Sequence, residues 1–260
     1  MDNQTNTNIE NDPHAINKSK RLFEIDFVKG LAVINMMIFH FFYLSHFMGV
    51  QNYKYDRGIL KFFAKSSHIT FIFVVGINLA ISYQKYKKAY EYNDDLVFKT
   101  NAHFGKQVKR AIFLIFAGIV MSILSYFAFG SMWIKFGIFH FIGVAILLAQ
   151  PIVSNKWLAL ITSLVVALLY LIFKEIKNVL TDKCFDAPFL CFISGAANVK
   201  YSSLDHFSII PYFGLVCLGI FVGHSIYKDG ERTYNLDTQH AEDNIIGKFI
   251  ALIGKHSLLI

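Results

Sequence analysis

One apolar stretch near the start of the sequence carries ionisable side chains at helical spacing. It reads EIDFVKGLAVINMMIFHFFYLSHF, and within it Lys29 and His40 are 11 residues apart. In a helix, 11 residues turn about 20° beyond three full turns and rise about 16.5 Å, so both residues share a face. Asp26 lies three residues before Lys29, within reach of it. The stretch therefore predicts an ion pair near one end of a helix and an imidazole towards the other.

Further ionisable residues lie in or beside other apolar stretches and could meet His40. A charge at mid-bilayer costs about 2.5–3.5 kcal/mol on insertion scales, so such residues are functional candidates. A neutral imidazole, with an ordinary pKa near 6.5, is suited to general-base work. We expect one cavity on the outer side, lined by His68, His140, Asp205 and His206.

Each candidate also has a purely structural interpretation. Lys29 could extend to the inner membrane surface with Asp26 as its ion pair, and His40 could be a packing histidine hydrogen-bonded across a helix bundle. His46 could simply lie at the interface. Four other histidines are placed in polar segments or at an exposed inner helix end: His14, His103, His240 and His224.

Together these residues could carry out group transfer across a membrane. Arg21, Lys29 and Arg110 offer positive charge at the inner end for an anionic donor. A deeper histidine could deprotonate a hydroxyl or amine, or take an acyl group itself. A metal site is less favoured, since no HxxxH-type pair with acidic partners is present.

The composition requires these residues to be positioned by membrane helices. Of 260 residues, 55% are hydrophobic and 17% are charged, against about 45–50% and about 25% in soluble domains. This excludes a disordered, collagen-like or disulfide-rich chain. The net charge of +7 is explained by membrane topology, and no motif for binding nucleic acid is present.

The apolar stretches predict an all-α, polytopic transmembrane bundle with six complete spans and a truncated seventh. A span needs roughly 20 apolar residues. The seventh stretch begins at Gly247 and has 14 residues to Ile260, too few to cross. The six complete spans are expected near Val28–Val50, Ile59–Tyr83, Ala111–Phe129, Phe136–Val153, Trp157–Phe173 and Phe207–Tyr227.

The distribution of Lys and Arg predicts a cytoplasmic N-terminus in a cell (inner) membrane. With that orientation the inner segments hold 14 of these residues and the outer ends hold 9, in line with the positive-inside rule. Residues 1–20 are expected to form a disordered polar tail before a membrane domain over 21–260. Cys184 and Cys191, in the outer loop, could form a disulfide or stay reduced, and a homodimer is possible.

Five motifs, in order along the chain, resemble those of the heparan-alpha-glucosaminide N-acetyltransferase catalytic-domain family. The resemblance covers about residues 20–260. The motifs are RLFEIDFVKGLAVINMMIFHFFY, FIFVVGINLAIS, FGIFHFIGVAILLAQP, LDHFSIIPYFGLVCLGIFVGHSIY and IGKHSLLI.

The resemblance implies roles for individual residues. The spacing of Lys29 and His40 is similar to the Arg-x10-His signature of the broader membrane acyltransferase class, which implies that Lys29 faces the donor and His40 the acyl group. Lys keeps the charge of Arg but loses its bidentate fork. In the characterised eukaryotic enzymes the proposed catalytic histidine lies in the outer loop after the first span, where His46 is the candidate. The Trp of the family's Pro-Trp motif is Tyr212 here. The catalytic residue therefore stays open between His40 and His46.

The sequence thus predicts an integral membrane acyltransferase without a metal cofactor. It would move an acetyl group from cytoplasmic acetyl-CoA, bound near Asp26, Lys29, Arg21 and Arg110, to an amine or hydroxyl of an extracytoplasmic sugar or glycolipid. The alternative is a non-catalytic permease or interaction protein that keeps the fold, which the Lys at position 29 and the short last helix favour. The family pattern continues that helix beyond IGKHSLLI, so we expect either a missing final span or a partly inserted helix.

Overall fold

The structure, a computed structural model, describes residues 22–50, 57–89, 96–175, 203–234 and 244–257. The predicted polar tail (1–20), Arg21 and the two loop cysteines, Cys184 and Cys191, lie outside these residues. The elements in chain order are α1 (Phe23–Phe47), α2 (Gly58–Ala89), α3 (Leu96–Phe129), a 3-10 turn η1 (Gly130–Met132), α4 (Ile138–Ala149), α5 (Lys156–Glu175), α8 (Ile209–Ile226), β1 (Tyr227–Lys228), β2 (Glu231–Arg232) and α10 (Ile245–Lys255).

Five of the described helices are long and apolar enough to cross a membrane. They are Phe23–Phe47, Gly58–Lys88, His103–Met132, Lys156–Glu175 and Ile209–Ile226. Large apolar side chains cover their outer faces; Phe116 on α3 is 63% exposed and Leu164 on α5 is 61% exposed. Such faces are stable in hydrocarbon rather than in water. The chain is a membrane protein.

The fourth predicted span, Phe136–Val153, is only partly helical. Its helix, α4, has 12 residues, which is short of the roughly 20 that a crossing needs. The backbone is extended at Gly137, just before the helix. Pro151, just beyond its end, has no N–H to continue the hydrogen-bond ladder. Of the six segments predicted as complete spans, five are therefore long helices in the described residues and one, α4, is a short helix.

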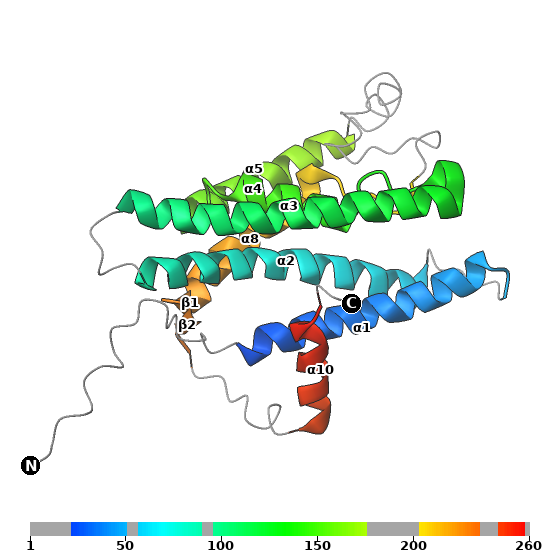
Figure 1. Ribbon diagram of the computed structural model, residues 1–260, viewed down its shortest axis with the longest axis horizontal. Helices are drawn as coiled ribbons and strands as arrows, with labels where there is room; N and C mark the ends of the chain where they lie inside the picture. The colour runs from blue at the N-terminus through cyan, green and yellow to red at the C-terminus, as the bar shows by residue number, and fades with distance from the viewer. Residues whose placement is uncertain (1–21, 51–56, 90–95, 176–202, 235–243, 258–260) are drawn as a thin grey trace, which may run out of the picture.

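Helix α8 lies between α2 and α5 and packs closely against both. Helix α1 packs against α2, and α3 packs against α4 (Figure 1). Buried serines join neighbouring helices: Ser163 of α5 donates to the carbonyl of Gly214 in α8 at 2.9 Å, and Ser67 of α2 donates to that of Ala32 in α1 at 2.7 Å. Interhelical hydrogen bonds of this kind replace the hydrophobic driving force that lipid removes.

Glycines bring the backbones of α2 and α8 into direct contact. A Cβ atom added to Gly76 would collide with the carbonyl oxygen of Val216, and one added to Gly219 with that of Phe73. Gly219 and Gly223 have the four-residue spacing of close helix crossings in membranes. The core cluster continues from this crossing through buried apolar residues such as Ile72 and Ile220.

The start of the predicted seventh span folds as α10, which has 11 residues. It runs across α1 rather than along it (Figure 1). Gly30 of α1 and Gly254 of α10 allow this contact, because a Cβ on either would collide with a backbone carbonyl of the other helix.

Candidate active site

The segment before α8 is hydrogen-bonded to the segment before α4. The amide of Phe207 donates to the carbonyl of Phe136 at 3.0 Å, and that of Leu204 donates to Met132 at 2.9 Å. Phe136 and His206 form a parallel bridge. These bonds join segments about 70 residues apart, and they hold the start of α8 beside the start of α4.

Asp205 caps α4 from outside that helix. Its Oδ2 accepts a hydrogen bond from the amide of Ile138, the first residue of α4, at 3.3 Å. Gly137 leaves room for this contact, because a Cβ there would lie 3.1 Å from Oδ2. Burial raises the pKa of the Asp205 carboxyl from 3.8 to about 6, while the Ile138 amide and the charge on His40 act in the opposite direction.

The rings of His68 and His140 pack against the two phenylalanines of these hydrogen-bonded segments. His68 meets Phe207 edge-on, with ring centroids 5.0 Å apart. His140 stacks on Phe136 at 5.6 Å, and its ring also fills the space above Gly118 of α3. Its Nδ1 atom is buried without a hydrogen-bond partner among the described residues.

His40 has a defined tautomer when neutral. Its Nδ1 lies 2.9 Å from the carbonyl oxygen of Met36, one turn earlier in α1. A carbonyl can only accept, so Nδ1 carries the hydrogen and Nε2 keeps the lone pair. The charge on His40 acts electrostatically on both His68 and Asp205.

The structure thus brings together much of the predicted outer site. His40, His68, Asp205 and His206 lie at one end of the bundle, and His140 joins them through Phe136. His46 lies in the last turn of α1 with a half-buried side chain, so it is part of the helix rather than of a loop.

The predicted donor end is brought together only in part. Lys29 Nζ lies 3.5 Å from Asp26 Oδ1, as the sequence predicts. Arg110 is half-buried on α3. Helices α1 and α3 both contact α2 and lie on either side of it in the view of Figure 1. Arg110 is thus on a different helix from the Asp26–Lys29 pair, which belongs to α1.

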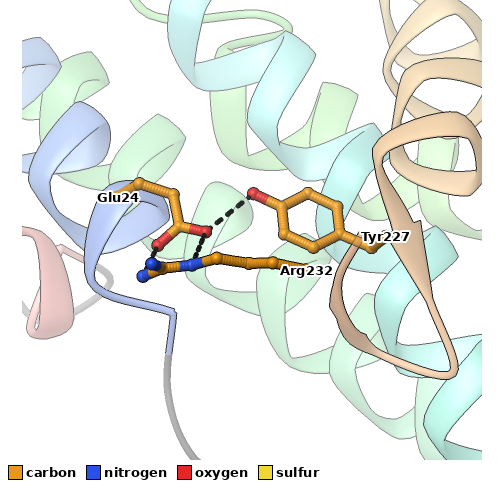
Figure 2. Close-up of polar contacts among 3 residues, drawn as sticks. All are labelled: Glu24, Tyr227 and Arg232. Atoms are coloured by element: carbon orange, nitrogen blue, oxygen red, sulfur yellow. Dashed lines mark hydrogen bonds and ion pairs between the residues drawn. The ribbon is translucent and has the colours of Figure 1, made fainter. Parts of the chain in front are cut away.

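A half-buried ion pair at the start of α1 was not predicted (Figure 2). Arg232 Nη2 lies 2.5 Å from Glu24 Oε2, its Nε donates to Oε1 at 2.8 Å, and the hydroxyl of Tyr227 donates to Oε1 at 3.1 Å. Burial and the neighbouring Glu24 raise the pKa of Tyr227. The hairpin β1–β2 therefore ties the end of α8 to the first helix.

A second polar network was also missed, and it corrects the placement of His224 and His103. His224 is half-buried: its Nε2 donates to the carbonyl of Val153 at 2.7 Å, and its Nδ1 pairs with Gln84 Nε2 at 3.0 Å. Gln84 Oε1 accepts from the amide of Gly230 at 3.1 Å. His103 is buried within α3. The sequence does hold one signal for this network, because Gln84 is a polar residue at the end of an apolar stretch.

Comparison with known proteins gives one family. No curated protein and no solved structure matches the chain significantly. The family model for the catalytic region of heparan-alpha-glucosaminide N-acetyltransferase matches residues 21–260. The match covers nearly the whole sequence, including every helix described above. The chain therefore belongs to the heparan-alpha-glucosaminide N-acetyltransferase catalytic-domain family.

Proposed function

We propose that this protein is an acetyltransferase of the cell membrane with a cytoplasmic N-terminus. It takes acetyl-CoA from the cytoplasm and acylates an amine or hydroxyl of an extracytoplasmic sugar or glycolipid. Family membership supports the reaction class. The observation that carries the residue assignment is the fixed tautomer of His40 within electrostatic reach of Asp205.

The chemistry needs one base and one counter-charge. The lone pair on His40 Nε2 removes the proton from the acceptor while the acceptor nitrogen or oxygen attacks the thioester carbonyl. The new C–N or C–O bond forms, the C–S bond breaks, and the thiolate leaves with the proton that His40 took up. The Asp205 carboxylate stabilises the intermediate imidazolium. Alternatively, Nε2 attacks first and carries the acetyl group.

The donor end supplies positive charge. Acetyl-CoA carries anionic phosphates, and Lys29 presents an ammonium group about 16.5 Å along α1 from His40. Asp26 holds that ammonium group in place through the 3.5 Å ion pair. Arg21 and Arg110 are further candidates for contacts to the phosphates.

The purified protein with labelled acetyl-CoA tests this proposal. We expect saturable donor binding and transfer of label to glucosamine-type acceptors. A protein that neither binds the donor nor transfers acetyl would contradict the proposal and favour the non-catalytic permease or interaction protein.

A further inference from the structure

A groove on the lateral surface of the bundle lies beside the candidate active site. Its volume is about 370 Å³. Its floor comes from α8 and the residues before it, and its walls come from α2 and α5. The lining residues are Ile69, Tyr170, His206, Ser208, Pro211, Tyr212 and Leu215.

The helix spacing explains the shape of the groove. Ser208, Pro211, Tyr212 and Leu215 follow the i, i+3, i+4, i+7 pattern of one helix face. Helix α8 packs against both α2 and α5, so this face forms the floor between them. Ser208 is the N-cap residue of α8 and is buried. The floor of the groove is therefore closely packed at the start of α8.

The walls of the groove belong to helices long enough to span the membrane, so we infer that the groove opens towards lipid. Its walls are Ile69 and Tyr170, which are 46% and 42% exposed. Both belong to membrane-spanning helices. Tyr170 lies five residues before the outer end of α5, about 7.5 Å along the axis. The opening is therefore at the depth of the outer leaflet, in the orientation proposed above.

The lining is amphiphilic. Ile69, Pro211 and Leu215 are apolar, whereas His206, Ser208 and Tyr212 carry polar groups. His206 follows Asp205 directly and is bridged to Phe136, so the polar part adjoins the candidate active site. A ligand that fits must combine an apolar part with a polar head.

We propose that the groove binds the acceptor as a lipid-linked sugar of the outer leaflet. The hydrocarbon chain lies against Ile69 and Leu215, and the sugar lies at His206 within reach of the His40–Asp205 pair. A soluble glycan would have to leave water and enter hydrocarbon to use this opening, which is costly. The proposal rests on the proposed function for the fate of the sugar, but binding in the groove can be measured without transfer.

Photo-crosslinking in lipid nanodiscs tests whether the groove binds a lipid-linked sugar. The probe is a glucosamine-headed glycolipid with a diazirine in its acyl chain, and a diazirine phosphatidylcholine is the comparison lipid. We expect the glycolipid to label peptides of α2 and α8 at the groove at least tenfold more than the phosphatidylcholine does. Excess unlabelled glycolipid should compete.

Two variants fill the groove, and a third variant outside the groove serves as a matched control. Ile69→Trp changes an exposed wall residue, and Leu215→Trp changes a half-buried floor residue. Each should lower labelling at least tenfold. Leu164→Trp adds the same ring to an exposed position of α5 outside the lining and should label as the wild type does.

The outcomes separate this proposal from the proposed function. Equal labelling by both lipids, or unchanged labelling in Ile69→Trp, would overturn the groove as the acceptor site. Acetyl transfer to a soluble glucosaminide without groove labelling would overturn the lipid route and leave the acetyltransferase standing. Groove labelling without transfer to any acceptor would keep the site and contradict the acetyltransferase.

Discussion

The carboxylate of Asp205 accepts the amide hydrogen of Ile138, so a residue before α8 caps the start of α4. The same carboxylate is within electrostatic reach of His40 on α1. One side chain thus serves both the fold and the candidate site, and substitutions can separate the two roles.

Asp205→Asn keeps an acceptor for Ile138 but removes the charge. The folded-state pKa of about 6 lies above the ordinary 3.8, so the wild type loses stability as the pH rises from about 4 to about 6. The variant does not titrate and should be more stable than the wild type at pH 7, by at most about 3 kcal/mol. At pH 4 the two should unfold alike. Thermal unfolding in detergent at both pH values measures this.

Transfer by the wild type should rise with pH through about 6, because only the ionised Asp205 stabilises the imidazolium of His40. Asp205→Asn should be slow at every pH and lack this rise. Asp205→Ala also loses the cap and should cost about 1 kcal/mol of stability relative to Asn. A wild-type rise that persists in Asp205→Asn would assign the titration to another group.

His40→Ala should leave donor binding intact and lower transfer by about 10²–10⁴-fold, the usual contribution of a general base. His256→Ala is a matched control, because His256 Nδ1 makes the same bond to the carbonyl four residues earlier, at 3.0 Å. The control should transfer at the wild-type rate. Loss of transfer in His46→Ala with retention in His40→Ala would move the catalytic base to His46.

Arg232→Gln should lower the free energy of unfolding by about 1–3 kcal/mol, because it leaves the Glu24 carboxylate with one charged partner fewer. The two side chains are 23% and 14% exposed. Lys88→Gln breaks the exposed pair with Glu231, whose side chains are 54% and 79% exposed, and should cost under about 1 kcal/mol. Equal losses of unfolding free energy in the two variants would show that the half-buried pair stabilises the fold no more than the exposed pair does.

Gly219→Ala should destabilise the bundle by about 1–3 kcal/mol, the usual cost of overpacking. Its new methyl would collide with the Phe73 carbonyl at the α2–α8 crossing. Gly105→Ala on α3 meets nothing within 4 Å and should gain about 0.5–1 kcal/mol from helix propensity. Thermal unfolding of the two variants side by side gives the comparison.

The long helices could be predicted from the sequence because length and hydropathy are local properties. The fourth segment could not, since its extended start at Gly137 depends on Asp205, 68 residues further along the chain. Hydropathy alone does not distinguish an apolar strand-like stretch from an apolar helix.

The polar contacts also divide into those that depend on nearby residues and those that depend on residues far away in the sequence. The Asp26–Lys29 contact is an i, i+3 relation and was predictable. The Glu24–Arg232 pair joins residues 208 apart and depends on the β1–β2 hairpin. Its turn had a readable signal, because Asp229 and Gly230 both have positive φ, as the Asp-Gly type I′ turn requires.

The glycine contact between α2 and α8 also limits how the protein can move. Their backbones touch at Gly76 and Gly219, so the two helices cannot slide past each other by one residue, about 1.5 Å, without a backbone collision. Helices α2 and α8 therefore move as one rigid pair. The proposed reaction needs one ligand from each side of the membrane. Among the described helices, a rearrangement that admits them therefore has to move α1, α3, α4, α5 or α10 relative to the α2–α8 pair.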